Sequence, residues 1–302
     1  MYGTTAVDRP PRDETPSAKL RSQARYLLIL CALMTLNGAS LAVDSPPAAQ
    51  PARAILDHAK QLNDTTRKWT DRTQSLNIKI FDSRGNVRNR VMTMRTQRRG
   101  GGEDKTLSVF LSPAEVRGTS FLQFAHRDRD AEQWLFLPAL QRVRQISAQS
   151  KTESFMGTDF SYRDLELLTD VLEWNEEEAT SVLSGSDVIE DTDVSLIELT
   201  PHKKDVGYTR IVLALTKQDL VIRRMEFYSA NTSTPQKVLR MDKIEFIDSI
   251  PTPRSLEMRQ TVQGSHTTVD VAEVRYNQNL RDDLFTQRTL EQGTESLEVS
   301  KD

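Results

Sequence analysis

A long succession of strand-like segments joined by short turns is the feature that most constrains the fold of this chain. About a dozen segments of about 8–11 residues follow one another after Thr73, many of them alternating apolar and polar side chains. In Tyr208–Thr216, for example, Ile211, Leu213 and Leu215 share one face. Short turns make neighbouring strands antiparallel, and the lack of helical crossovers excludes a doubly wound sheet. The sequence therefore predicts one large, curved antiparallel sheet.

Helical segments are few and short. Pro51–Leu62 places its apolar residues at helical spacing, a second helix follows Ser161, and a third is expected at Asp282–Leu290. The apolar face of a sheet must be covered, so we expect these helices to lie over its concave face. The predicted class is mainly β (α+β), a large curved antiparallel sheet with short helices covering that face.

The first 42 residues differ from the rest of the chain. Basic residues precede the apolar run Tyr26–Leu36, and small residues follow it at 39–42. The run of about 11 residues is shorter than the roughly 20 needed to span a bilayer. Residues 1–42 are therefore predicted to be a secretory signal peptide, with an uncleaved anchor as the alternative.

Cysteine usage indicates the compartment. Cys31 is the only cysteine and lies within the apolar run. Lipidation would require a small residue before it, whereas Leu30 is large. The mature chain would then contain no cysteine, which excludes a disulfide or a thiolate metal site and fits a bacterial periplasm.

Three long blocks of the sequence carry a family resemblance. Gly102–Leu122, Gln133–Ser147 and Ser154–Leu165 resemble the outer-membrane lipoprotein-sorting protein family. This family consists of LolA-like periplasmic proteins, often linked with exporters of the RND or MMPL type. The order and spacing of the blocks extend the resemblance over most of the chain from about Pro51.

The resemblance implies a LolA-like open half-barrel with helices across its mouth. It also implies a hydrophobic cavity that holds an acyl chain or a similar amphiphile. A single domain is expected over residues 51–292. A flexible leader rich in Pro, Ala and Ser is expected at 43–50, and a disordered tail at 293–302.

Apolar residues in consecutive strands and in the block 154–165 are the candidates for the ligand site. Trp134 and Phe136 share one strand face, whereas Phe121 and Phe124 point to opposite faces. One face is therefore predicted to line the cavity and the other to meet a helix or a partner, with plain core packing as the alternative for each residue. The candidate ligand-binding residues are Leu107, Val109, Phe121, Trp134, Phe136, Phe155, Met156 and Phe160.

The block 154–165 combines a turn with the start of a helix. Ser161 and Asp164 have the spacing of a capping box, and Gly157 permits a tight turn. Phe155, Met156 and Phe160 must then be buried, at about 1.5–3 kcal/mol each, against the concave face of the sheet. The block is either a fixed plug or a movable lid.

The charged residues are interpreted in structural terms rather than as catalytic groups. Asp159 and Asp164 have no histidine or nucleophile nearby, so we expect them to cap backbone groups or to pair with Arg142 and Arg144. A further group of arginines could meet phospholipid head groups or an acidic partner, or form a solvated face. This group comprises Arg84, Arg88, Arg90, Arg95, Arg98 and Arg99.

Patterns typical of enzymes, metal sites and nucleic-acid binding are missing from the sequence. The net charge of −3 gives no reason to expect a nucleic-acid partner. The chain has no G-x-S-x-G, P-loop or Rossmann pattern, and its histidines lack metal-ligand spacing. The histidines are His58, His126, His202 and His266. We therefore expect no enzymatic activity, no cofactor and no metal.

The leading hypothesis is a periplasmic carrier, secreted across the inner membrane, that binds a lipid, a lipoprotein acyl chain or another amphiphile. It would serve outer-membrane lipoprotein sorting or an RND-type exporter. Such an exporter and other envelope proteins are the expected protein partners. The alternative is a ligand-free accessory module that docks on an envelope transport complex through its arginine-rich strands or a sheet edge. A lipid hydrolase is a third hypothesis, disfavoured by the lack of a recognisable nucleophile arrangement.

Overall fold

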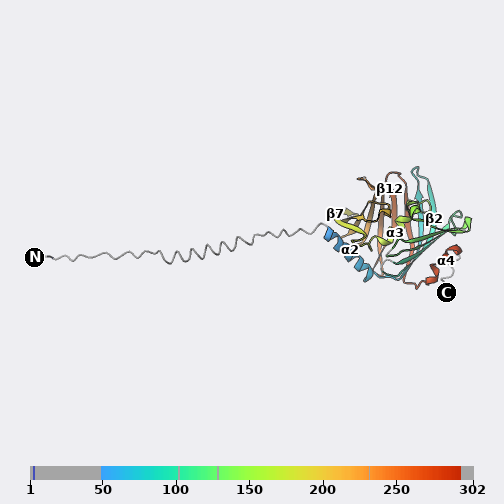
Figure 1. The fold of residues 1–302 in the computed structure, drawn as a ribbon, viewed down its shortest axis with the longest axis horizontal. Helices are drawn as coiled ribbons and strands as arrows, with labels where there is room; N and C mark the ends of the chain where they lie inside the picture. Colours follow the sequence, from blue (N-terminus) through green and yellow to red (C-terminus); the bar gives the residue numbers. More distant parts are fainter. Residues whose placement is uncertain (1–2, 4–48, 101–102, 128, 231, 294–302) are drawn as a thin grey trace. The chain divides into compact units, whose positions relative to one another are not determined.

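A computed structural model describes residues 3, 49–100, 103–127, 129–230 and 232–293 (Figure 1). The chain divides into two units, Met1–Pro47 and Ala48–Asp302, and the account below concerns the second. The predicted signal peptide, Cys31, most of the predicted leader and nearly all of the predicted tail lie outside the described residues.

One antiparallel sheet of 13 strands forms the body of the second unit, which confirms the predicted fold class. Its strand order is β6-β5-β4-β3-β2-β1-β13-β12-β11-β10-β9-β8-β7. The strands are β1 (Asp71–Phe81), β2 (Val87–Arg98), β3 (Asp104–Ser112), β4 (Ser120–Phe124), β5 (Glu132–Leu137), β6 (Arg142–Gln145), β7 (Ala179–Ile189), β8 (Thr192–Pro201), β9 (Arg210–Thr216), β10 (Ile222–Tyr228), β11 (Lys237–Ile247), β12 (Ile250–Gln260) and β13 (His266–Tyr276).

The strand order follows from two meanders that meet in the middle of the sheet. The first six strands run outward from β1 to one edge. The chain then crosses through the helix α3 (Tyr162–Asp170) to the opposite edge, where β7 begins the second meander. The last strand, β13, returns to pair with β1, from Arg72↔Tyr276 to Phe81↔His266. Residues far apart in the sequence therefore line the centre of the sheet together.

The helices are short, and none of those described is long and apolar enough to cross a membrane. The first described helix, α2 (Ala49–Asp64), begins two residues before the predicted Pro51. The predicted C-terminal helix is divided into η4 (Asp282–Leu284) and α4 (Gln287–Gln292), because Thr286 caps a new helix by accepting from the Thr289 amide at 3.1 Å. Three further 3₁₀ turns are η1 (Pro138–Leu140), η2 (Ala148–Thr152) and η3 (Lys204–Val206).

Both faces of the sheet are covered, but by different parts of the chain. On the inner face, α2 and α3 pack on the second meander, where Leu56 and Leu213 are fully buried. The outer face of β3–β5 packs against the C-terminal segment through Leu284 and Leu290. This placement differs from the expectation that all helices cover the concave face. The inner face over the first meander is left for the segment that precedes α3.

Candidate ligand cavity

A cavity of about 260 Å³ lies between the inner face of the sheet and the segment leading into α3. Strands of both meanders form one wall, and the opposite wall comes from residues 155–169. Most of its lining is apolar, including Leu76, Met92, Val269, Phe155, Phe160 and Leu165. The cavity thus has the apolar character and nearly the size of small-molecule sites, which measure about 300–1,000 Å³.

The cover loop, residues 153–161, is a small hairpin over this cavity. The Phe155 amide donates to the Phe160 carbonyl at 2.7 Å, and the Thr158 amide donates to the Phe155 carbonyl at 3.0 Å. Met156 and Gly157 have φ angles of 51° and 72°. Two consecutive positive φ angles are typical of a type I′ turn, and glycine satisfies the second without steric cost.

Polar contacts hold the cover loop at both of its sides. On β2, Arg90 donates to the Met156 carbonyl and Arg88 donates to the Gly157 carbonyl at 3.2 Å. On β13, Thr267 donates its hydroxyl to Asp159 at 2.6 Å and accepts from the Asp159 amide at 2.9 Å. These contacts attach the hairpin to strands on either side of β1.

Aromatic packing adds an apolar anchor to the same loop. The Phe155 ring lies 5.2 Å from Phe121, 5.9 Å from Phe110 and 5.6 Å from Tyr162, measured between ring centroids. The Phe155–Phe121 and Phe155–Tyr162 pairs meet edge to face, the arrangement that aromatic quadrupoles favour. Phe155 therefore inserts between the sheet and the helix start and helps to close the cavity.

The start of α3 confirms the predicted capping box. Ser161 accepts from the Asp164 amide at 3.1 Å, and Asp164 accepts from the Ser161 amide at 2.7 Å. Asp164 is fully buried and also accepts from Tyr208 and Lys237, each at 2.6 Å. Burial, followed by the charge of Asp164, raises the pKa of Tyr208 far above its usual range. The helix start is thus tied to strand β11 and to the chain before β9.

The predicted pairing of the two carboxylates with Arg142 and Arg144 is wrong. Asp159 accepts from Ser265 at 2.5 Å as well as from Thr267. Arg144 instead lies 3.4 Å from the Ser150 hydroxyl. Residues of the second meander donate hydrogen bonds to both carboxylates, because the topology brings this meander beside the cover loop.

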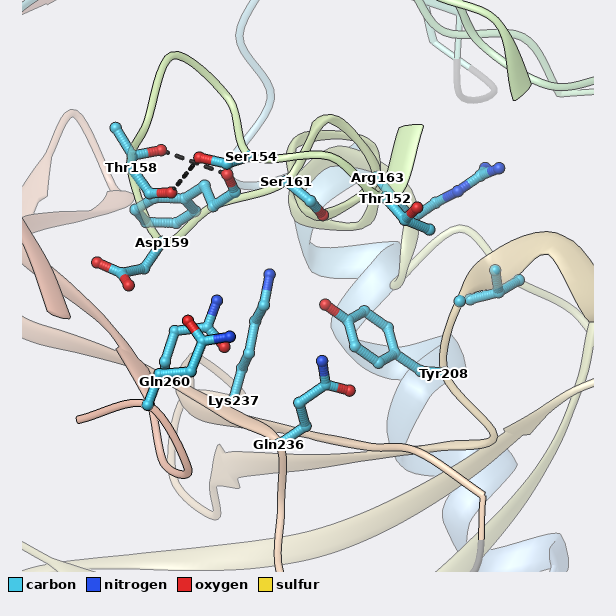
Figure 2. Close-up of a pocket in the computed structure, with 14 residues that line it drawn as sticks. Thr152, Ser154, Thr158, Asp159, Ser161, Arg163, Tyr208, Gln236, Lys237 and Gln260 are labelled. Carbon is cyan, nitrogen blue, oxygen red and sulfur yellow. Dashed lines mark hydrogen bonds between the residues drawn. The ribbon is translucent and has the colours of Figure 1, made fainter. Parts of the chain in front are cut away.

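A second hollow of about 300 Å³, mainly polar, lies on the other side of the cover loop (Figure 2). Lys237 and Tyr208 extend toward the loop from below, with Gln236 and Gln260 beside them (Figure 2). Phe160 lines both hollows. The cover loop therefore separates an apolar cavity from a polar pocket.

Comparisons with known proteins agree with this geometry. A family model described as "-like: Uncharacterized protein" matches residues 102–292. A domain from Vibrio parahaemolyticus, designated an outer membrane lipoprotein-sorting protein, is 26% identical with a TM-score of 0.73, over 80% of this chain and 99% of that one. The chain belongs to the family of this model, and its relatives of known structure include an outer-membrane lipoprotein-sorting domain.

Other solved structures support the LolA-like fold. A DUF1329 family protein from Desulfovibrio piger is 29% identical with a TM-score of 0.72, over 81% of this chain and 99% of that one. A LolA superfamily protein from Nitrosomonas europaea has a TM-score of 0.59 at 18% identity, over 79% of this chain and 98% of that one, and shows the shared fold. No sequence among the curated proteins matches the chain.

The structure divides the predicted ligand residues between the two sheet faces. Phe121, Phe155 and Phe160 line the LolA-like cavity, whereas Met156 packs against the same apolar cluster without lining the cavity. The remaining four lie on the outer face, packed against the C-terminal segment. These four are Leu107, Val109, Trp134 and Phe136.

Strand register explains this division. Leu107 is paired with Leu122, which is paired with Trp134, and paired residues point to the same face. Phe121 alternates with Leu122 and therefore faces the cavity. The sequence predicted two aromatic faces correctly, and the C-terminal segment is the element that meets the outer one.

Sequence reasoning missed the contribution of the last strands. Leu256 of β12 and Val269 and Val271 of β13 line the cavity beside the first meander. Alternation in 267–271 was a usable signal, because Thr267, Val269 and Val271 share one face. The signal did not indicate that this face would lie beside β1.

The predicted arginine group does not form one head-group surface. Arg88 and Arg90 donate to the cover loop, Arg98 pairs with Asp104, and Arg99 pairs with Asp282. Arg95 is buried on its strand, and Arg84 is exposed in the turn before β2. Among the described residues, no group of three or more His, Cys, Asp or Glu side chains is arranged to hold a metal ion.

Asp170, the last residue of α3, supplies a pH-dependent contribution to stability. Burial, followed by nearby carboxylates, raises its pKa from 3.8 to about 7. The folded state therefore binds this proton more tightly than the unfolded chain, so stability falls as pH rises from about 4 through about 7. One pKa unit corresponds to about 1.4 kcal/mol, so Asp170→Asn should be more stable than the wild type by about 1–4 kcal/mol at pH 8.

Urea unfolding at pH 4 and pH 8 checks this expectation. The advantage of Asp170→Asn should largely disappear at pH 4, where the wild-type carboxyl group is mostly protonated in the folded state. Glu176→Gln, at an exposed position, is the matched control and should change stability little at either pH. An equal effect of Asp170→Asn at both pH values would contradict the assignment.

Proposed function

We propose that this LolA-like protein is a periplasmic carrier that holds the acyl chain of a lipid, a lipoprotein or another amphiphile. The observation that carries the proposal is the apolar cavity between the inner sheet face and the cover loop. Its wall combines strands of both meanders, and its cover is attached by reversible polar and aromatic contacts. A chain can therefore be enclosed without any covalent step.

Apolar burial would supply the affinity. Each buried methylene contributes about 0.8 kcal/mol, so ten contribute about 8 kcal/mol before the costs of association. Such binding has little directional specificity, which suits a carrier that accepts and releases its cargo. Phe121, Phe155 and Phe160 are proposed as ligand contacts.

The family relationship supports the proposed location and cargo. The Vibrio relative is designated a lipoprotein-sorting protein, and the N-terminal residues have the pattern of a secretory signal. We infer a periplasmic location, a lipid or lipoprotein as cargo, and an envelope protein such as an RND- or MMPL-type exporter as partner. Neither a catalytic step nor a cofactor is part of the proposed role.

Extraction of the protein purified from the periplasmic fraction, followed by lipid mass spectrometry, tests the proposal. We expect a bound amphiphile at up to about one molecule per chain, with an envelope lipid or a lipoprotein fragment as its source. The same experiment includes delipidated protein, which should rebind a fluorescent acyl probe. Protein that carries no amphiphile and binds no acyl probe would favour the ligand-free accessory module instead.

A further inference from the structure

A row of polar side chains crosses the wall of the cavity at one end of its mainly apolar lining. The strand register places Arg72 of β1 opposite Thr96 of β2, Thr96 opposite Thr106 of β3, and Thr106 opposite Gln123 of β4. All four side chains line the cavity. This polar row, Arg72–Thr96–Thr106–Gln123, is one continuous rung across four strands.

Part of the polar row is already hydrogen-bonded within the protein. The hydroxyls of Thr96 and Thr106 lie 3.3 Å apart, and Gln133 donates to Gln123 at 2.8 Å. The Nε atom of Arg72 is buried without a hydrogen-bond partner. A buried polar atom that lacks a partner costs about 1–3 kcal/mol, so a ligand that supplies an acceptor would recover this cost.

The charge of Arg72 is only partly compensated, by the Tyr276 side chain and by the more distant Asp104 carboxylate. Among the described residues Arg72 takes part in no ion pair, and its guanidinium lies 5.0 Å from the centre of the Trp69 ring. Arg98 lies over the same ring at 4.3 Å, and its own guanidinium is 3.5 Å from Asp104. Arg72 thus presents a charge, which a guanidinium keeps at any physiological pH, to the cavity.

The next rung is mixed, with Gln74, Met94 and Ser108, and the apolar part of the cavity follows it. Along β1, Gln74, Leu76 and Ile78 follow Arg72 on the same inner face, and all three line the cavity. The six residue steps along the strand from Arg72 to Ile78 correspond to about 20 Å, a length that accommodates an extended acyl chain. A polar end and an apolar channel are therefore arranged in line.

We propose that Arg72 and the polar row bind the anionic oxygen head group, a carboxylate or a phosphate, of a single-chain amphiphile. The chain extends from Arg72 past Leu76 and Ile78 toward the cover loop. This inference rests on the proposed carrier function and narrows its cargo to amphiphiles with one chain and an anionic end. Arg72 is suited to this role because its planar guanidinium can donate two parallel hydrogen bonds to such a group.

Competition binding with delipidated full-length protein tests the inference. Palmitate, hexadecyl phosphate and 1-hexadecanol share a chain length and differ in head group, and each displaces a neutral fluorescent probe from the cavity. We expect at least one of the two anions to bind about 10-fold or more tightly than the alcohol, since hydrogen bonds to charged groups have that magnitude. The preferred anion identifies the head group as carboxylate or phosphate.

Variants at Arg72 separate the head-group contact from a general loss of structure. Arg72→Gln should remove the preference for the anion and leave hexadecanol binding unchanged, whereas Arg72→Lys should retain part of the preference. Arg275→Gln, at an exposed position of β13, is the matched control and should bind all three ligands as the wild type does.

Two results would contradict the inference, and they are distinguishable. Equal binding of the anions and the alcohol by the wild type, or an equal loss of all three in Arg72→Gln, would overturn head-group recognition and leave the carrier function intact. Failure of the wild type to bind the probe or any of the three ligands would overturn the carrier function together with this inference.

Discussion

Replacement of Lys237 by methionine is expected to lower the free energy of unfolding by about 3–5 kcal/mol. The Lys237 ammonium lies 2.6 Å from the Asp164 carboxylate, and their side chains are 7% and 0% exposed. Removal of the lysine would leave the carboxylate buried without its positive partner. Tyr208 and the Ser161 amide still donate to Asp164, but neither carries a compensating charge.

Urea unfolding monitored by circular dichroism measures this loss. Lys79→Met changes an exposed lysine on β1 and, as the matched control, should alter stability by less than about 0.5 kcal/mol. The double variant Lys237→Met with Asp164→Asn should recover part of the loss, because the buried charge is then removed together with its partner. A Lys237→Met variant within about 1 kcal/mol of the wild type would show that hydrogen bonds alone stabilise the buried Asp164.

Local patterns in the sequence predicted local structure well. The capping box needs only residues three apart, and Ser161 and Asp164 form it as expected. Alternation in single strands likewise predicted the mainly β class and the long antiparallel strands. Propensity and hydrogen bonding between near neighbours decide these features, so the sequence carries them directly.

The features that the sequence did not predict depend on contacts between residues that lie far apart in the chain. Lys237 reaches Asp164 across 73 residues, and β13 pairs with β1 only after the chain has crossed the sheet. Alternation shows that Trp134 and Phe121 point to opposite faces, but the C-terminal segment decides which face is filled. Val269 lines the cavity only because β13 pairs with β1. The cavity is therefore a property of topology more than of any one segment.

Replacement of Val269 by tryptophan is expected to abolish binding of acyl ligands. Val269 lies on β13, pairs with Ile78 of β1 and lines the cavity facing the cover loop. An indole ring at this position would occupy the space that an acyl chain needs, and most of its surface would be buried in an apolar site. Filling the hollow also adds packing contacts, so the variant should remain folded.

The control for Val269→Trp must introduce a tryptophan that does not enter the cavity. Val188→Trp, on the edge strand β7 where valine is 59% exposed, is the matched control and should keep wild-type affinity for the probe. We expect Val269→Trp to lose at least about 100-fold in affinity, since most of the apolar burial behind binding is lost. Lipid mass spectrometry of the two purified variants gives an independent readout. If Val269→Trp unfolds as the wild type does and still retains its lipid, the cargo must bind elsewhere, and the polar pocket beyond the cover loop becomes the next site to test.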